Sequence, residues 1–248
     1  MATQMIFLIL CYLMAALPFG VIVTTVWGGD LDIRVSGSGN IGATNVARVY
    51  GWGLAGPVAA LDIGKGLLPV TVARFLWPEL GIWWPSLVAL VAFVGHCYPV
   101  YLSFNGGKGV ATGAGALLAV TMVPTLVAGA IWGAVLAWTG RASVAALVAC
   151  LGLILFVSYW QPSALPVVLL LASGVVFSHL TNIGRLVKGQ EKAVVSPVRM
   201  QRGGSSESGG NPLEQAPGGP NSPAPPMWTG VTKDPLDATI PPTDPGSG

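Results

Sequence analysis

Long apolar stretches alternate with short polar segments over residues 1–196. Each stretch approaches or exceeds the roughly 20 residues that a helix needs to cross a bilayer. The stretches are Met5–Trp27, Leu54–Leu76, Ile82–Leu102, Val110–Trp138, Ser143–Trp160 and Leu165–Leu180. In the first of them, Pro18 and Gly20 predict a kink. This pattern is typical of an all-α integral membrane protein.

The stretch Val110–Trp138 decides how many spans there are, because its 29 residues are long for one span and short for two. A turn at Pro124 gives a seven-transmembrane-helix bundle. With the N-terminus outside, only Arg74 then lies toward the outside, and the other loop cations fall inside, as cytoplasmic loops prefer. A single helix would give six spans and leave Arg185–Arg202 outside. A five-span arrangement, in which two short pairs are single elements, also keeps the C-terminus inside.

Composition agrees with a lipid environment. Only 9% of the residues are charged and 52% are hydrophobic, whereas soluble domains average roughly 25% charged residues. No Lys or Arg precedes Arg34, so the first apolar stretch is expected to stay as an anchor rather than act as a cleaved signal. We therefore expect a multi-pass protein of the cell membrane, with its N-terminus outside and its C-terminus cytoplasmic.

The chain changes character at Pro197. Eleven of its 20 prolines lie from Pro197 to Pro245, together with many Gly and Ser residues. Such a segment cannot bury enough apolar area to offset the entropy of ordering it. Residues 1–196 are therefore predicted to form the membrane domain, and residues 197–248 a disordered tail. The alternative is a docking segment whose only apolar anchor is Met227 and Trp228.

The three cysteines, Cys11, Cys97 and Cys150, all lie within apolar sequence. They show neither CxxC nor metal-ligand spacing. We interpret them as packing residues, and we predict no disulfide framework, no metal site and no cofactor.

The first polar cluster, Gly37–Arg48, has the composition of an anion site. Glycines let backbone N–H groups converge, hydroxyl and amide side chains add hydrogen bonds, and Arg48 adds a planar charged fork. A glycine-rich turn between helices is the alternative. The candidate site residues are Gly37, Ser38, Gly39, Asn40, Gly42, Thr44, Asn45 and Arg48.

The second cluster pairs His96 with a glycine-rich loop before an apolar helix. A helix N-terminus offers unpaired N–H groups and partial positive charge, and Lys108 adds a full charge. The segment is not a P-loop, because Leu102 stands where that motif needs Gly and Gly109 where it needs Ser or Thr. The candidates here are His96, Gly106, Gly107, Lys108, Gly109 and Thr112.

The third cluster follows the last apolar stretch. If that helix continues, His179 and Asn182 lie at i and i+3 on one face, with Arg185 close by. Lys188 and Lys192 are interpreted as a positively charged cytoplasmic flank.

One ionisable pair lies within an apolar stretch. Asp62 and Lys65 are three residues apart and can pair across one helical turn. Such groups usually face the bundle interior or a polar cavity. A structural ion pair and a site-lining role are equally compatible with the sequence, and His96 alone is as compatible with helix packing as with catalysis.

On these motifs the chain resembles the bacterial membrane acyl-phosphate:glycerol-3-phosphate acyltransferases. The match covers roughly Met5–Lys192 and leaves out the tail. It is carried by Gly37–Arg48, by the run Asp62–Gly66, by Gly95–Thr112 and by His179–Lys192. The three polar clusters, in this order and with family-like spacing, are highly specific.

The resemblance implies a seven-helix bundle and a function in phospholipid biosynthesis. Such enzymes move a fatty acyl group from acyl phosphate to the 1-hydroxyl of glycerol 3-phosphate, giving lysophosphatidic acid and phosphate. The expected partners are these substrates, membrane lipid and a functionally coupled enzyme that forms acyl phosphate, but no nucleic acid. By match to the motifs, the catalytic residues would be Ser38, Arg48, Lys108, His179 and Asn182.

Two positions depart from the family pattern. Asn105 stands where relatives often have Lys, and Leu180 where they often have Arg. Neither change removes a residue expected to be essential. Neither histidine has an Asp five residues later, so the His-x4-Asp arrangement of other glycerolipid acyltransferases is absent. The competing interpretations are a membrane transporter for a small anion and a scaffold that recruits partners through the tail.

Overall fold

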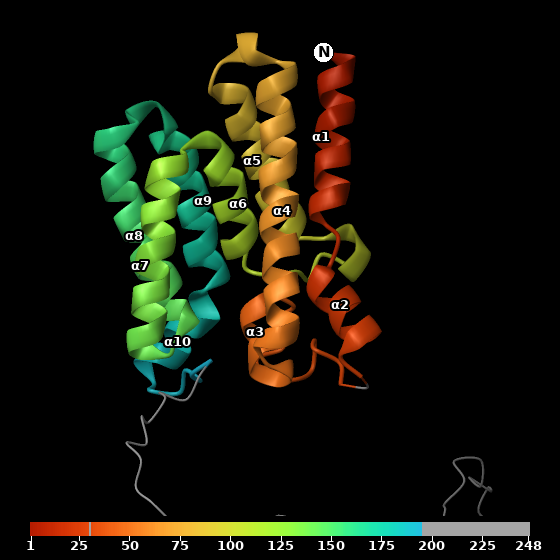
Figure 1. Cartoon of the computed structure of the whole chain (residues 1–248), viewed down its shortest axis with the longest axis vertical. Helices are drawn as coiled ribbons and strands as arrows, with labels where there is room; N and C mark the ends of the chain where they lie inside the picture. The colour runs from red at the N-terminus through yellow and green to blue at the C-terminus, as the bar shows by residue number, and fades with distance from the viewer. Residues whose placement is uncertain (30, 195–248) are drawn as a thin grey trace, which may run out of the picture. The chain divides into compact units, whose positions relative to one another are not determined.

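The computed structural model describes residues 1–29 and 31–194, and every regular element in these ranges is helical. The long helices stand side by side, and α3 and α10 lie at the same end of the bundle (Figure 1). The helices are α1 (Ala2–Ala15), α2 (Phe19–Trp27), α3 (Ala43–Tyr50), α4 (Trp52–Leu76), α5 (Trp83–Cys97), α6 (Val110–Val120), α7 (Met122–Thr139), α8 (Ala142–Trp160), α9 (Leu165–Ser178) and α10 (Leu180–Val187). Short 3-10 turns cover Pro78–Leu80, Val100–Leu102 and Pro162–Ala164.

The kink predicted in the first apolar stretch is confirmed. Helix α1 ends before Pro18, and α2 continues at an angle of 40° to it. Gly20 then packs so closely on the next polar loop that a Cβ at this position would lie 1.7 Å from the carbonyl oxygen of Ile41. The kink therefore places α2 directly against the Gly37–Gly42 segment.

The predicted apolar stretch Ile82–Leu102 is found as the helical segment Trp83–Leu102, which is long and apolar enough to span. Within it, helix α5 ends at Cys97 and a 3-10 turn follows, because Pro99 forces Tyr98 out of the helical region, to φ −129° and ψ 63°. The chain after α5 is thereby free to form the polar loop that carries Lys108.

The stretch Val110–Trp138 breaks into two helices, as predicted. The break falls at Thr121, and Pro124 lies in the first turn of α7, where a helix tolerates proline. The single-helix interpretation behind the six-span count is therefore wrong.

Among the described residues, three helical segments are long and apolar enough to cross a membrane: Trp83–Leu102, Met122–Thr139 and Ala142–Trp160. The number rises to five if the bent pairs α1–α2 and α9–α10 each count as one span. The seven-span count and the orientation of the termini stay predictions.

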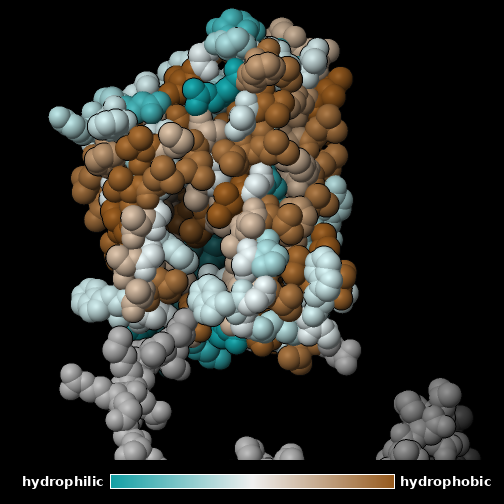
Figure 2. All heavy atoms as spheres, viewed as in Figure 1, coloured by the Kyte–Doolittle hydropathy of each residue, from teal (hydrophilic) through white to brown (hydrophobic). Residues whose placement is uncertain are grey.

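Close backbone contacts hold α4 and α6 together at the centre of the bundle. A Cβ at Gly66 would lie 2.0 Å from the carbonyl oxygen of Thr112, and one at Gly115 equally close to that of Ile63. In lipid, where apolar burial between helices gains little, such small residues let helices approach closely enough to pack well. Figure 2 shows hydrophobic residues over the middle of one face and hydrophilic residues toward its two ends.

Of the three cysteines, Cys11 and Cys97 are buried and Cys150 is half-buried. The predicted disordered tail, residues 197–248, lies outside the described residues.

Candidate active site

Two adjoining cavities receive residues from all three polar clusters. The first, of about 570 Å³, runs between α6, α7, α8 and α9 and is called the apolar cavity here. The second, of about 720 Å³, lies among the loops before α3 and α6 and the start of α10, and is called the polar cavity. Both are lined by Ser38, Asn40, Lys108 and Arg185, so the cavities meet at these four residues.

Asn45 organises the first loop from inside. Its Oδ1 accepts hydrogen bonds from the backbone N–H of Ser38 at 2.8 Å and from Nη1 of Arg48 at 3.1 Å. Its Nδ2 faces the carbonyl oxygens of Ile33, Ser36 and Asn40 within 3.2 Å. With 2% of Asn45 exposed, this amide shapes the loop, whereas Ser38 is left exposed at the junction of the cavities.

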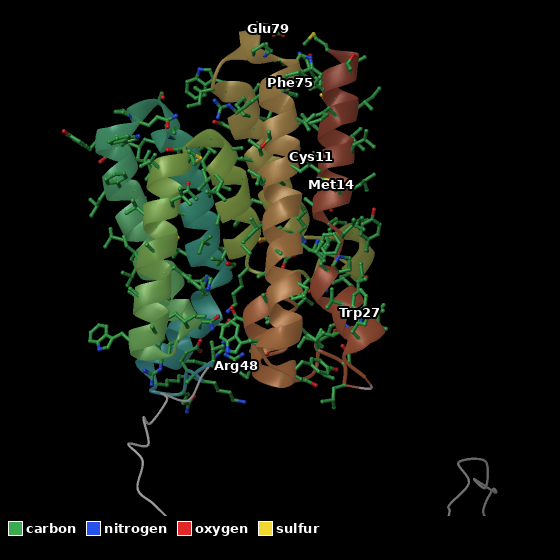
Figure 3. All side chains as sticks on the ribbon, in the orientation of Figure 1. Cys11, Met14, Trp27, Arg48, Phe75 and Glu79 are labelled. Atoms are coloured by element: carbon green, nitrogen blue, oxygen red, sulfur yellow. The ribbon has the colours of Figure 1, made fainter. Side chains whose placement is uncertain are left out.

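Arg48 extends from α3 toward the segment that follows α10 (Figure 3). Its Nε donates to the carbonyl oxygen of Ala193 at 3.4 Å. Burial lowers the pKa of Arg48, and so does the charge of Arg185, while Glu191 opposes them. A half-buried guanidinium beside a second cation is a strong attractor for an anion.

The second loop is shaped by its own backbone. The N–H groups of Gly106 and Gly107 donate to the carbonyl oxygens of Cys97 and His96, each at 3.1 Å. Gly109 has φ +74°, and a Cβ there would strike the ring of Phe93. The N–H groups left for a ligand are therefore those at the start of α6, since the first residues of a helix have no intrahelical acceptor.

Lys108 joins the second loop to the third cluster. Its ammonium group donates to Oδ1 of Asn182, and its backbone carbonyl accepts from Oγ of Ser178 at 3.1 Å. Burial lowers the pKa of Lys108 to about 8, with Arg185 and Arg48 adding to the effect and Glu191 opposing it. Because burial disfavours the charged form of this ammonium group, an incoming anion stabilises that form strongly.

The last helix does not continue through the third cluster. It bends by 56° at His179, whose backbone leaves the helical region at ψ 4°. His179 and Asn182 nevertheless line the same cavity. Nδ1 of His179 lies 2.8 Å from the carbonyl oxygen of Val175, which can only accept, so Nδ1 carries the proton and Nε2 is left as the acceptor in the neutral ring.

Two residues that sequence reasoning passed over complete the polar site. Glu191, 7% exposed at its side chain, accepts from Asn182 at 2.5 Å, from Arg185 at 2.8 Å and from Oγ of Ser143 at 2.8 Å. Burial favours the neutral carboxyl, but these hydrogen bonds hold the pKa of Glu191 below its usual value. The sequence offered only two signals for these residues. Glu191 is a single carboxylate within a basic segment, and Ser143 lies in the first turn of an apolar stretch.

All but one of the predicted site residues line a cavity. The exception is Thr112, which is fully buried where α6 packs against Gly66 of α4. The apolar cavity includes Gly37, Ser38, Asn40, Gly42, Thr44, Asn45, Arg48, His96, Lys108, Gly109, His179, Asn182 and Arg185. The polar cavity adds Gly39, Gly106 and Gly107. No group of His, Cys, Asp or Glu suited to a metal ion occurs within the described ranges.

The apolar cavity continues away from these polar groups between α7 and α8. Small side chains line it on both helices, among them Ala128, Gly129, Ala146 and Ala149, with Leu153 deeper along α8. From Ser143 to Leu153 the helix rises roughly 15 Å. This space suits an extended alkyl chain attached to a polar head at Lys108. Figure 2 shows a hollow among the hydrophobic residues with hydrophilic atoms inside it.

The sequence is similar to those of known glycerol-3-phosphate acyltransferases. A family model described as glycerol-3-phosphate acyltransferase matches residues 5–189. The curated glycerol-3-phosphate acyltransferases of Pseudomonas paraeruginosa and Azotobacter vinelandii are each 42% identical over 74% of this chain and 96% of theirs. That of Jannaschia sp. is 43% identical over 75% of this chain and 90% of its own.

Two solved structures are similar in fold. One is the crystal structure of PlsY (YgiH), an integral membrane glycerol 3-phosphate acyltransferase, in its glycerol 3-phosphate form. It has a TM-score of 0.71 and 32% identity, with 77% of this chain and 95% of that chain covered. The lysophosphatidic acid form gives a TM-score of 0.69 and 31% identity over the same shares.

Proposed function

This chain belongs to the glycerol-3-phosphate acyltransferase family, and on that premise we propose that it transfers a fatty acyl group from acyl phosphate to the 1-hydroxyl of glycerol 3-phosphate. The products are lysophosphatidic acid and phosphate. The enzyme is embedded in a membrane and serves phospholipid biosynthesis. The comparisons favour this activity over the alternative of an anion transporter.

The meeting of the two cavities at Lys108, Arg185 and Ser38 is the observation that carries the proposal. Glycerol 3-phosphate has no apolar part and fits the polar cavity. The acyl donor has both a charged head and a long apolar tail, and it fits the apolar cavity with its head at the junction. Two anionic molecules thus meet between cations, which is what this transfer requires.

The proposed reaction is a direct acyl transfer. The 1-hydroxyl oxygen of glycerol 3-phosphate bonds to the acyl carbonyl carbon as the bond from that carbon to the phosphate oxygen breaks. The hydroxyl proton passes to the released phosphate, which takes the electrons of the broken bond and therefore accepts a proton readily. Atoms and charge balance without any covalent enzyme intermediate.

Each predicted catalytic residue has a role that suits its position. Arg48 and Lys108 hold the phosphate groups. Ser38 and Asn182 position glycerol 3-phosphate, and Nε2 of His179 accepts a hydrogen bond from the attacking hydroxyl. Orientation of this kind supplies a large share of a rate enhancement, and N–H groups at the start of α6 are suited to stabilise charge that develops on the carbonyl oxygen.

The donor can be tested directly. Acyl phosphate is an activated mixed anhydride, which fits a site without the His-x4-Asp arrangement of a strong base. Purified protein is given glycerol 3-phosphate with acyl phosphate, acyl-CoA or acyl carrier protein, and lysophosphatidate and phosphate are measured. Product from acyl phosphate alone is the expected result. Product from acyl-CoA at an equal or higher rate contradicts the choice of donor.

The topology is part of the proposal. We place seven spans, with the N-terminus outside and the C-terminus cytoplasmic, because this keeps nearly all loop cations inside. A reporter fused after Trp160 should report the outer side, and a cytoplasmic signal there refutes seven spans. Deleting residues 201–248 should leave the activity intact, whereas a scaffold acting through the tail would fail. Coupling to an enzyme that forms acyl phosphate follows from the chemistry of the donor.

A further inference from the structure

A buried cluster of ionisable groups lies at the wall of the apolar cavity, which Asp62 and His96 help to line. Nζ of Lys65 is 2.9 Å from Oδ1 of Asp62, and the two side chains are 2% and 3% exposed. The same carboxylate oxygen lies 3.6 Å from Nδ1 of His96, a nitrogen that has no hydrogen-bond partner within 3.5 Å. Ionisable groups inside an apolar helix are costly, so a cluster of three has to do something that a packed apolar core would not.

One end of the cluster supports the second loop. The ring of His96 lies against Gly107 so closely that a Cβ at Gly107 would be 2.0 Å from Nε2. The backbone of His96 also accepts the N–H of Gly107 at 3.1 Å. The ring therefore packs directly against the residue before Lys108.

The other end of the cluster holds the break between α1 and α2. Nζ of Lys65 donates to the carbonyl oxygen of Leu17 at 2.8 Å and lies 5.4 Å from the centre of the Phe19 ring. Beyond this break, Gly20 packs against the carbonyl oxygen of Ile41 in the first loop. The cluster thus stands between the two loops that bring cations to the site.

We propose that Asp62, Lys65 and His96 are positioning residues. Asp62 holds the His96 ring against Gly107 and so sets the place of Lys108, while Lys65 fixes the carboxylate and ties it to the turn behind the first loop. The inference rests on the acyltransferase function proposed above. It assigns a role to Asp62 and Lys65, which are not among the predicted site residues, and gives His96, a predicted substrate-binding residue, a positioning role.

The first test replaces the ion pair by neutral groups of similar size, in the variant Asp62→Asn/Lys65→Met. No unpaired charge is left buried, so the protein should fold with a thermal midpoint close to that of the parent. Its kcat should fall about 10- to 100-fold, because a misplacement of the order of 1 Å is enough for such a loss. Arg74→Met is the matched control, because it removes the link from α4 to the carbonyl oxygen of Ala119 far from both loops; its kcat should be unchanged.

A spectroscopic readout separates positioning from general destabilisation. The chain has two histidines, so protein with labelled histidine gives two sets of imidazole signals by NMR. Asp62→Asn/Lys65→Met should shift the signals of His96 and leave those of His179 in place. Parent-like kcat in this variant, or a lowered kcat with unshifted His96 signals, overturns the inference.

Two further arms keep the test decisive. If the double variant does not fold, His96→Gln replaces it: an amide cannot keep the ring contact with Gly107, so kcat should fall by a similar factor, and full activity overturns the inference. If the parent protein makes no lysophosphatidate from acyl phosphate, the proposed donor fails. The His96 signals still report whether Asp62 and Lys65 hold the ring.

Discussion

The two ends of the apolar cavity are built in different ways. At the junction with the polar cavity, nearly every side chain is fixed by a partner: Lys108 by Asn182, and Asn182 and Arg185 by Glu191. Between α7 and α8 the wall consists of small apolar residues with no directional bonds. The polar end is arranged in advance for charge, whereas the apolar end offers only space.

This difference separates chemistry from selection. A preorganised set of donors and cations stabilises a transition state because it need not rearrange when charge develops. An apolar wall discriminates weakly, by about 1–3 kcal/mol for a methylene group. Changes at the polar end should therefore affect turnover strongly and with any donor, and changes at the apolar end should affect the choice of acyl chain.

The largest effect is expected from the cations at the junction. Arg48→Ala and Lys108→Ala should each lower kcat/KM for acyl transfer by about 100- to 1,000-fold, as for the loss of a charged donor to a transition state. Lysophosphatidate formation measures the effect, and circular dichroism in detergent checks the fold. Lys188→Ala is the control, since Lys188 is exposed and lines neither cavity; its activity should be kept. Retained activity in Arg48→Ala or Lys108→Ala contradicts the roles assigned to them.

A second change tests whether the polar end is fixed by its own hydrogen bonds. Glu191→Gln keeps the size of the side chain but removes the charge that Arg185 and Asn182 share. The free energy of unfolding should fall by about 2 kcal/mol, the scale of a hydrogen bond to a charged group. Because the folded pKa of Glu191 lies below its usual value, this stabilisation is present above the ordinary carboxyl pKa and lost as the pH falls through the folded pKa.

Unfolding in a denaturing detergent, followed by circular dichroism at neutral and acidic pH, measures this difference. Glu79→Gln is the matched control, since Glu79 is an exposed carboxylate in a turn at the other end of α4. If the two variants are equally stable at neutral pH, the hydrogen bonds of Glu191 do not hold the polar end together.

The pH dependence of catalysis gives a smaller effect at the same place. The pKa of Lys108 is lowered to about 8 by burial, so its ammonium group loses its proton as the pH rises above that value. The ratio kcat/KM should then fall roughly tenfold per pH unit, since this ratio reports groups of the free enzyme. Lys108→Arg keeps its charge in this range. The fall of kcat/KM at alkaline pH should therefore disappear in Lys108→Arg. If the fall is unchanged in this variant, another group is responsible for it.

The sequence predicted the polar end far better than the apolar end. Gly37–Arg48 and the loop before α6 were predicted to form an anion site because such a site needs glycine, hydroxyl, amide and cationic groups close together in the chain, and both segments line the cavities. Glu191 and Ser143 were missed because their role depends on a contact between α8 and the segment after α10, 48 residues apart. Thr112 was assigned to the site, but it is fully buried and lines neither cavity.

The helices themselves were predictable from hydropathy, and two of their interruptions from proline. The break at His179 was not predicted, because no glycine or proline marks it. Hydrogen bonds of Ser178 to Lys108 and of His179 to Val175 occur there. The cavity between α7 and α8 left no signal in the sequence at all. Both helices are apolar all round, so their spacing gives no hint of which small residues face a ligand.

The smallest expected effect probes that apolar wall with two glycines of one helix. Gly129 and Gly133 lie one turn apart on α7, and a Cβ at either position meets no atom within 4 Å. Only Gly129 lines the apolar cavity. Gly129→Phe should therefore lower kcat/KM for a palmitoyl donor by roughly 10-fold relative to an octanoyl donor, while Gly133→Phe leaves this ratio at its parent value.

Comparing Gly129→Phe with Gly133→Phe separates an effect on the apolar cavity from a general effect on helix α7. Both substitutions add the same ring to the same helix at a site with room for it, so any loss of stability or of membrane insertion should be shared. A change in chain-length preference confined to Gly129→Phe means that the space between α7 and α8 holds the acyl chain. If Gly129→Phe lowers kcat/KM equally for the octanoyl and palmitoyl donors, the ring acts on the polar end instead. The division between a chemical end and a selective end then does not hold.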